Sequence, residues 1–285
     1  MNKLYGSFII FFYFIKYPIA ILLPIFYFVL DFQQSIILNL IWIISIALII
    51  KDKIYPQKKE CNLNNKNVIS KVISLQIGKV KTIKDDSISD GKWSTGSFKE
   101  PVLNIKNVTF NGIEGDEVSD LVHHGGVDKA VFANSYENYE QWAKYLGKDN
   151  LAFGALAENL TLSNIKEENV YIGDIHKIGT VIFEVSQPRE PCWKISKKHN
   201  NKTFTKHIYD TGRTGWYYRV LEEGQIQKDD EVELLKRVDN SINILKANDV
   251  LHHPNENKEL VDYLLNLDIL GKPFRNSLKR KINSK

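Results

Sequence analysis

A single cysteine in a proline-rich loop is the residue most suited to chemistry. Residues 187–194 read Gln-Pro-Arg-Glu-Pro-Cys-Trp-Lys and follow a β-branched run at 180–186. Each proline fixes its own φ and pushes the residue before it into extended backbone, so we expect a stiff loop. Arg189 and Lys194 flank Cys192, and neighbouring cations favour a thiolate, the form that attacks electrophiles or binds soft metals. The alternative is an inert structural cysteine. The prolines and cations favour the reactive one.

A histidine–glycine cluster is the second candidate. Residues 123–129 read His-His-Gly-Gly-Val-Asp-Lys. Gly125 and Gly126 let the backbone approach a ligand closely or adopt positive φ. Lys129 and the imidazoles of His123 and His124 are then able to hold an anion such as a phosphate. A glycine turn with solvated histidines is the simpler alternative. Zinc is not indicated, because adjacent histidines without a nearby Cys or further His lack zinc-ligand spacing.

Two shorter segments add polar groups. Residues 157–161, Ala-Glu-Asn-Leu-Thr, offer the Glu158 carboxylate and the Asn159 amide. Residues 212–215, Gly-Arg-Thr-Gly, place the Arg213 cation between glycines. Each segment alone is weak evidence for a site.

Short strands must position these residues. Runs with β-type alternation or β-branching end at turn residues, and one helix, capped by Ser135 and ended by Gly147, interrupts them. After Arg237 the period becomes helical. The pattern predicts a β-rich α+β fold with a barrel-like core and a small C-terminal helical appendage. The expected strands are 72–77, 102–110, 180–186, 216–220 and 231–235, and the expected C-terminal helices are 241–251, 257–267 and 273–282.

Two apolar stretches open the chain, at residues 8–30 and 35–50, and a four-residue turn beginning at Asp31 separates them. A membrane-spanning helix needs roughly 17–25 apolar residues. The second stretch is at the short end of that range, and the first qualifies only if Lys16 reaches the interface. We predict that residues 1–55 form a hairpin of two transmembrane helices. A buried helical pair in a soluble core is the alternative.

The flanking charges predict the orientation of this hairpin. Lys3 precedes it, four lysines follow it at 51–59, and the turn carries only Asp31. The positive-inside rule puts both ends in the cytoplasm. We therefore expect an inner-membrane protein whose soluble domain faces the cytoplasm, with Cys192 as a free thiol. Residues 56–67 are polar and are predicted to be a linker.

The overall composition excludes several classes of protein. The chain has 285 residues, 25% of them charged, which excludes a disordered or collagen-like protein. A net charge of +4 does not indicate nucleic-acid binding. Its two cysteines, Cys61 and Cys192, are too few for a disulfide scaffold, a four-cysteine zinc site or a cysteine-ligated iron–sulfur cluster.

Taken in order, the segments LVHHGGVDKAV, AENLTL, SQPREPCWK and GRTGWYYRV resemble the MOSC domain family, the module at the C-terminus of molybdenum cofactor sulfurases. The closest resemblance is to the YiiM-like branch. This resemblance implies a MOSC domain at residues 68–236 and a three-helix extension at residues 237–285. The resemblance implies a β-barrel-like fold that binds the molybdenum–pterin cofactor, with Cys192 as metal ligand, and that reduces N-hydroxylated compounds such as hydroxylaminopurine base analogues. Pyridoxal phosphate binding is a further association of the family. The implied catalytic residues are Cys192, His124 and Glu158, and the implied cofactor contacts are Lys129, Asn159, Arg189, Arg213, Gly125 and Gly126.

The chain departs from the family pattern in two places. The usual Gly-Glu-Asn is Ala157-Glu158-Asn159 here. If that turn needs positive φ, Ala157 costs about 1 kcal/mol and is expected to shift Glu158. The apolar N-terminal stretches are also foreign to the ordinary family pattern.

The first hypothesis is therefore a membrane-tethered molybdenum enzyme that acts on a small-molecule N-hydroxylated substrate and does not bind nucleic acid. Its electrons would come from a separate flavin or iron–sulfur protein, because residues 68–285 contain no G-x-G-x-x-G nucleotide-binding motif. The second hypothesis is a non-catalytic carrier of the cofactor or of sulfur, tethered to the membrane. The third is a membrane adaptor whose barrel binds nothing.

Overall fold

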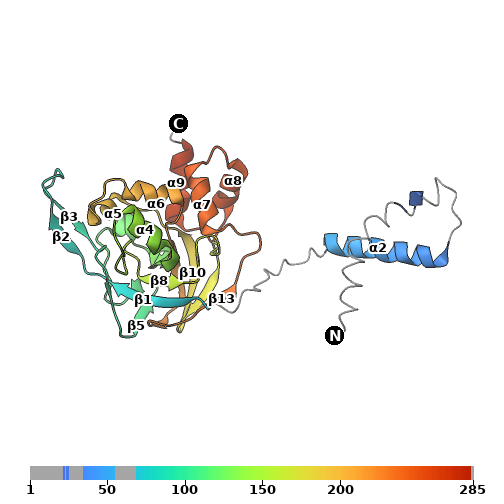
Figure 1. Cartoon of the computed structure of the whole chain (residues 1–285), viewed down its shortest axis with the longest axis horizontal. Helices are drawn as coiled ribbons and strands as arrows, with labels where there is room; N and C mark the ends of the chain where they lie inside the picture. The colour runs from blue at the N-terminus through green and yellow to red at the C-terminus, as the bar shows by residue number, and fades with distance from the viewer. Residues whose placement is uncertain (1–21, 23, 26–34, 55–68, 284–285) are drawn as a thin grey trace. The chain divides into compact units, whose positions relative to one another are not determined.

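The computed structural model describes residues 22, 24–25, 35–54 and 69–283 (Figure 1). The chain divides into two compact units, residues 1–67 and 68–285, which are described separately.

Helix α2 (Ile36–Ile54) belongs to the first unit. It has 19 residues, but those at 51–53 are Lys, Asp and Lys, so its apolar run is shorter than the roughly 17 residues that a membrane span needs. Among the described residues, no helix is both long enough and apolar enough to cross a membrane. The predicted transmembrane hairpin, and the inner-membrane location drawn from it, are therefore wrong. Most of the first apolar stretch and the linker at 56–67 lie outside the described residues.

An eight-stranded sheet is the main feature of the second unit. Its order is β13-β9-β10-β11-β7-β8-β1-β4. Neighbouring strands run antiparallel except for β7 and β8, which are parallel. The second unit is thus a mixed α+β fold with a large sheet. The strands are β1 (Lys71–Ile77), β4 (Glu100–Pro101), β7 (Val131–Ser135), β8 (Leu160–Ser163), β9 (Ile175–Ile178), β10 (Val181–Pro188), β11 (Trp216–Glu222) and β13 (Val232–Lys236).

Strand β1, next to the short edge strand β4, is hydrogen-bonded to the start of β13 at the other edge of the sheet. Lys71 in β1 forms an isolated bridge with Glu231, just before β13. The Val72 amide donates to the Asp230 carbonyl at 2.9 Å, and the Val232 amide donates to the Ser70 carbonyl at 2.8 Å. The sheet therefore closes on itself as a barrel-like core.

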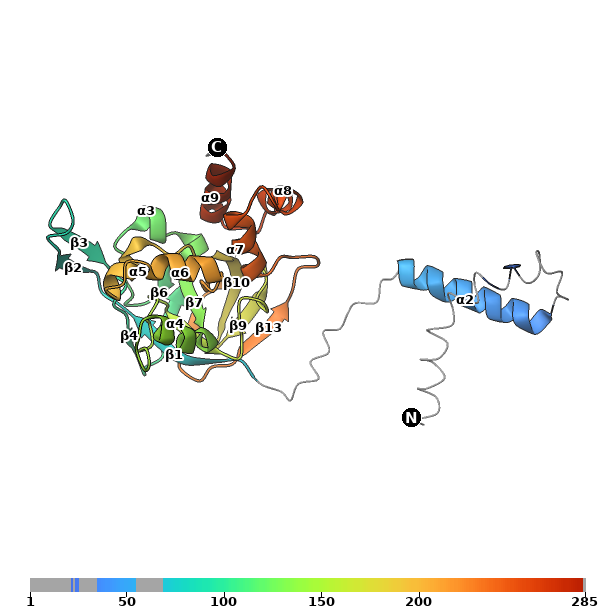
Figure 2. The same cartoon turned by 45° about the horizontal axis from the view of Figure 1, so that its top comes forward.

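Two small sheets and two groups of helices surround this core (Figure 2). Helices α7, α8 and α9 gather at one end of the domain, next to α6. The small sheets consist of β2 (Lys81–Lys84) with β3 (Lys92–Thr95), and of β12 (Gly224–Ile226) with β5 (Lys106–Thr109) and β6 (Gly112–Ile113). The helices are α3 (Leu121–His124), α4 (Tyr139–Tyr145), α5 (Trp193–Lys198), α6 (Phe204–Thr211), α7 (Ile244–His252), α8 (Lys258–Asn266) and α9 (Lys272–Asn283), with 3₁₀ turns η1 (Val127–Lys129) and η2 (Tyr136–Asn138).

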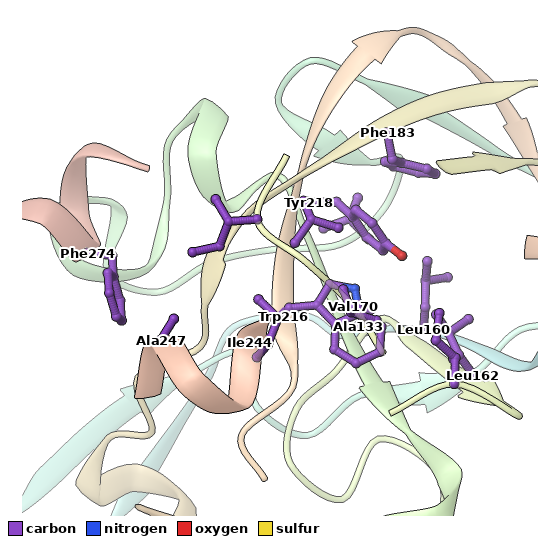
Figure 3. Close-up of a cluster of buried hydrophobic side chains, with 14 of the residues drawn as sticks. Ala133, Leu160, Leu162, Val170, Phe183, Trp216, Tyr218, Ile244, Ala247 and Phe274 are labelled. Atoms are coloured by element: carbon purple, nitrogen blue, oxygen red, sulfur yellow. The ribbon is translucent and has the colours of Figure 1, made fainter. Parts of the chain in front are cut away.

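One hydrophobic cluster joins the barrel to the C-terminal helices (Figure 3). Trp216 of β11 is fully buried in this cluster, together with Ile244 and Ala247 of α7. Phe274 of α9 belongs to the same cluster. Burial of a large apolar side chain of this kind stabilises the fold by roughly 1.5–3 kcal/mol. The three helices therefore share the core of the barrel.

Two elements differ from their predicted limits. Residues 102–110 do not form one strand, because β5 pairs with β12 and β6 in a separate small sheet. The helix expected to begin after Ser135 begins at Tyr139 as α4. Ser135 instead ends β7, and its hydroxyl donates to the Glu137 carboxylate at 2.6 Å rather than accepting from a helix amide.

Candidate functional site

A pocket beside the barrel brings together five of the predicted site residues. It contains about 650 Å³ of open space between the segments at 95–99, 116–119 and 189–195. Predicted residues that line it are His124, Lys129, Asn159, Arg189 and Cys192. They come from three segments that are far apart in the sequence, 123–129, 157–161 and 187–194, so only the folded barrel assembles them.

Cys192 lies at the start of a helix, at the rim of this pocket. It is the N-cap residue of α5, with extended backbone. Its carbonyl accepts hydrogen bonds from the Ile195 amide and the Thr205 hydroxyl, both at 3.1 Å. These bonds fix the backbone of the cysteine, and the partly exposed residue carries a free thiol. Within the described part of the chain, no group of three His, Cys, Asp or Glu side chains is placed to hold a metal.

Arg189 provides a buried cation that lacks a full set of partners. The residue is only 4% exposed, and its Nη2 donates to the Leu156 carbonyl at 3.3 Å. Its Nη1 is buried without a hydrogen-bond partner. The guanidinium carbon lies 5.2 Å from the centre of the Phe132 ring. Because buried donors in native proteins nearly always have partners, this nitrogen is available to an acceptor that enters the pocket.

His124 is the last residue of α3, and Lys129 is the last residue of η1. Burial, together with the nearby Arg189 charge, lowers the pKa of His124 to about 4, so its imidazole is neutral at pH 7. Burial also lowers the pKa of Lys129 below its usual value of 10.5. The Lys129 ammonium donates to the His123 carbonyl at 2.6 Å and lies 5.7 Å from the centre of the Tyr217 ring. Lys129 thus provides the pocket with a partly desolvated ammonium group whose position is fixed by the His123 carbonyl.

The two glycines of this segment shape the turn and do not line the pocket. Gly126 has a φ of +96°, which glycine adopts without strain. A Cβ on Gly125 would lie 2.9 Å from the Leu121 carbonyl oxygen. Both therefore act on the path of the backbone that presents His124 and Lys129.

Asp128 anchors the same segment to the barrel and to α9. Its carboxylate accepts hydrogen bonds from Arg219 Nε at 2.9 Å and Nη2 at 2.6 Å. It also accepts from the Lys272 amide at 2.8 Å, at the start of α9. The Asp128 carbonyl accepts from the Ser186 hydroxyl at 2.5 Å. One residue thus fixes the position of η1 relative to β10, β11 and α9.

Asn159 belongs to a polar cluster that the sequence did not reveal. Its Oδ1 accepts from the Phe132 amide at 3.2 Å, and its Nδ2 donates to Asp116 at 2.9 Å. Asp116 also forms a buried ion pair with Lys99. Burial lowers the pKa of Lys99, and the Asp116 charge opposes that effect. Lys99 and Asp116 line the pocket, although neither lies in a motif that suggests chemistry.

Glu158 lies behind the wall of the pocket and does not line it. It is fully buried and accepts hydrogen bonds from the Leu156 amide at 2.9 Å and the Tyr139 hydroxyl. Ala157 before it has a φ of +72°, so the turn does need positive φ, and Ala157 adopts it. These bonds hold the Glu158 carboxylate within the protein, away from the pocket in which the predicted catalytic role would place it.

Arg213 lies outside the pocket. Its Nη1 donates to the Gln141 side chain on α4 at 2.6 Å, and its Nη2 is 3.9 Å from Glu168. A cation between glycines resembles an anion site in sequence, but here it joins the 212–215 turn to α4. The arginine that does line the pocket, Arg189, lies in the loop of Cys192.

Known proteins resemble most of this chain. The MOSC domain profile matches residues 120–233. The Bacillus subtilis (strain 168) protein YflK is 38% identical over 212 residues, which are 74% of this chain and 93% of YflK. The Escherichia coli (strain K12) protein YiiM is 32% identical over 181 residues, which are 62% of this chain and 80% of YiiM.

A solved structure and a protein named as an enzyme complete the comparison. The crystal structure of YiiM from Geobacillus stearothermophilus superposes with a TM-score of 0.62 at 29% identity, covering 75% of this chain and 99% of that one. A protein of Gibberella moniliformis (strain M3125 / FGSC 7600) named Reductase is 41% identical over 129 residues, which are 44% of this chain and 23% of that protein. The chain belongs to the MOSC domain family, in its YiiM-like branch.

Proposed function

We propose that this MOSC protein binds the molybdenum–pterin cofactor in the pocket at Cys192 and reduces N-hydroxylated small molecules with electrons from a partner protein. The observation that carries the proposal is the buried Arg189, whose Nη1 lacks a partner beside Cys192. The reaction converts R–NH–OH, two electrons and two protons into R–NH₂ and water. The N–O bond breaks, and its oxygen leaves as water.

The residues of the pocket fit such a cofactor. The pterin cofactor carries a terminal phosphate, and the Arg189, Lys129 and Lys194 cations line the pocket. The Cys192 thiol suits a soft metal centre, and no competing protein cluster of metal ligands is present in the described residues. When bound, the cofactor would supply the two-electron redox chemistry, which no side chain of the pocket provides.

The side chains of the chain itself would orient the substrate and deliver protons. The neutral His124 imidazole is available as a hydrogen-bond donor or acceptor. The Lys129 ammonium carries a proton, and its lowered pKa makes it a stronger acid than a surface lysine. The rings of Phe132 and Tyr217, whose centres are 5.3 Å apart, give the pocket an aromatic wall suited to a planar base analogue.

Two further points bear on the reaction class. The name Reductase of the Gibberella moniliformis relative supports an oxidoreductase. None of the relatives reported above names pyridoxal phosphate, so that association takes no part in the proposal. The carrier hypothesis shares the same pocket and differs only in predicting no turnover.

The decisive experiment uses the full chain purified from a host that makes the molybdenum cofactor. Elemental analysis measures molybdenum, fluorescence of the oxidised extract measures pterin, and chromatography measures conversion of hydroxylaminopurine to the aminopurine with reduced methyl viologen. Molybdenum with turnover is the expected result. Molybdenum without turnover would favour a carrier, and the absence of molybdenum would contradict both.

A further inference from the structure

A second, wider opening leads to Cys192 from outside the pocket. It is a groove with about 1,880 Å³ of open space between α3, the loop at 190–194 and α9. The groove and the pocket share four lining residues: His124, Lys129, Cys192 and Lys194. A molecule in the groove and a substrate in the pocket would therefore meet at the same cysteine from two sides.

The groove concentrates positive charge. Five of its lining residues are lysine or arginine, and two, Asp120 and Glu190, are acidic. Its formal charge of +3 compares with +4 for the whole chain of 285 residues. The cations are Lys129, Lys194, Lys272, Lys279 and Arg280. The surface next to Cys192 thus complements a negatively charged partner.

Three of these cations lie on the exposed side of α9. Lys272, Lys279 and Arg280 are seven and eight residues apart, a spacing that places them along one face of a helix. All three are exposed, whereas Phe274 and Leu278 on the other side of α9 are buried in the core. The start of α9 is tied to Asp128, so the cations sit on a fixed support.

The groove also exposes large apolar side chains. Val122 is 85% exposed and Trp193 is 49% exposed, and both line the groove. Leu121, next to Val122 on α3, is 74% exposed. Apolar residues within a charged rim are typical of protein–protein contacts, and transient redox complexes bury comparatively small areas of this kind. A small anion would leave this apolar surface uncovered.

We infer that the groove is the docking surface for an acidic electron-carrier protein with a flavin or iron–sulfur group. The inference rests on the proposed function and adds the place where its electrons enter. The reduced carrier would deliver two electrons in succession at the Cys192 end of the groove, and the substrate would take up two protons and release water through the pocket. Separate entrances would let the carrier exchange while the substrate stays bound.

The test reverses the charges of α9 and compares two reductants. The variant Lys272→Glu/Lys279→Glu/Arg280→Glu is assayed with a reduced acidic flavodoxin and with reduced methyl viologen. A matched variant, Lys144→Glu/Lys177→Glu/Lys236→Glu, changes the net charge equally at exposed residues that do not line the groove. The expected result is a more than tenfold lower kcat/KM for flavodoxin in the groove variant only. In the groove variant, kcat/KM for flavodoxin should also depend less on ionic strength, while turnover with methyl viologen does not fall.

The outcomes separate this inference from the proposed function. If the unmodified protein does not turn over substrate with reduced methyl viologen, the proposed function itself is wrong. Viologen turnover with unchanged flavodoxin kinetics in the groove variant, or an equal loss in the matched variant, would overturn the docking surface. Retention of the unmodified protein on anionic vesicles or single-stranded DNA, abolished by the same substitutions and without any flavodoxin dependence, would assign the groove to another partner.

Discussion

At residue 157 an alanine occupies a backbone conformation that favours glycine. Its φ of +72° costs an L-residue roughly 1–2 kcal/mol. This cost is partly offset because alanine loses less conformational entropy on folding than glycine does. We expect Ala157→Gly to stabilise the protein by about 1 kcal/mol and to raise its Tm by about 2–4 °C. Thermal unfolding measures the change. A matched Ala155→Gly variant, at a residue without positive φ, should instead lose stability.

Cys192 is the residue on which the proposed chemistry depends. We expect Cys192→Ser to lose molybdenum and turnover, because oxygen is a harder and far less acidic ligand than sulfur. Its Tm should stay within a few degrees, since the backbone bonds of Cys192 do not involve the thiol. Elemental analysis and thermal unfolding test both statements, with Cys61→Ser as the control. Full molybdenum content in the Cys192 variant would contradict the ligand assignment.

Local sequence identified some residues of the pocket and misplaced others. Cys192 and Arg189 share a loop whose prolines and charges are visible in the sequence. Lys99 was missed because it lies in a short connection between strands, and only folding brings it to Asp116. Arg213 was misplaced because a cation between glycines looks alike whether it binds a ligand or, as here, a neighbouring helix. Sequence motifs report the type of a residue more reliably than the direction it faces.

Among the elements, the 3₁₀ turn η1 is attached to β11 and α9 through the carboxylate of Asp128. We expect Asp128→Asn to cost about 1–3 kcal/mol of unfolding free energy, because it removes a charged acceptor from Arg219 and from the Lys272 amide. Chemical denaturation measures the loss, and hydrogen exchange should show faster opening of the first turn of α9. Asp268→Asn, at an exposed residue, provides the control. Equal stability of the two variants would show that Asp128 anchors nothing.

Two of the predicted strands match the structure closely, whereas a strand next to a polar motif was missed. The run at 180–186 corresponds to β10, and that at 231–235 to β13, within two residues at each end. By contrast β8 was read only as part of a polar motif, since its four residues follow directly on Glu158 and Asn159. Its place in the sheet is set by pairing with β1 and β7, which are distant in sequence. Long-range pairing of this kind leaves little trace in a short run of residues.

For the molecule as a whole, buried histidines make stability depend on pH. Burial lowers the pKa of His176, beside Tyr218 and Asp174, from 6.5 to about 4. The folded state therefore binds this proton less readily than the unfolded state. The contribution of His176 to the free energy of unfolding is fully present above pH 6.5. It is lost as the pH falls from 6.5 towards 4, by roughly 3 kcal/mol at most. Urea unfolding at several pH values measures this loss.

A variant isolates the contribution of this histidine. His176→Gln should lower stability at pH 7 and flatten the decline between pH 6.5 and pH 4. His123→Gln, whose side chain is 71% exposed, should leave the decline unchanged. An unaltered pH dependence in the His176 variant would place the acid sensitivity elsewhere.

The family of the whole molecule was predictable, whereas the character of its N-terminal part was not. Four ordered motifs identified the MOSC domain, because each reflects local chemistry. The transmembrane prediction failed on length, since the charged residues at 51–53 belong to the same helix as the apolar run. Hydropathy along a sequence does not show where a helix ends.

The closure of the barrel by its first strand has a consequence for synthesis of the protein. Val72 pairs with Leu162 on one side, and its backbone bonds to Asp229 and Asp230 on the other. The ribosome must therefore add roughly 160 further residues before β1 has all its neighbours, which at about 5–20 residues per second takes about 8–30 s. During that time a β-branched edge is open to other chains. Nascent-chain complexes halted before residue 229 should therefore need a chaperone to stay free of aggregates, and complexes extended so that residues 229–236 have left the exit tunnel should not.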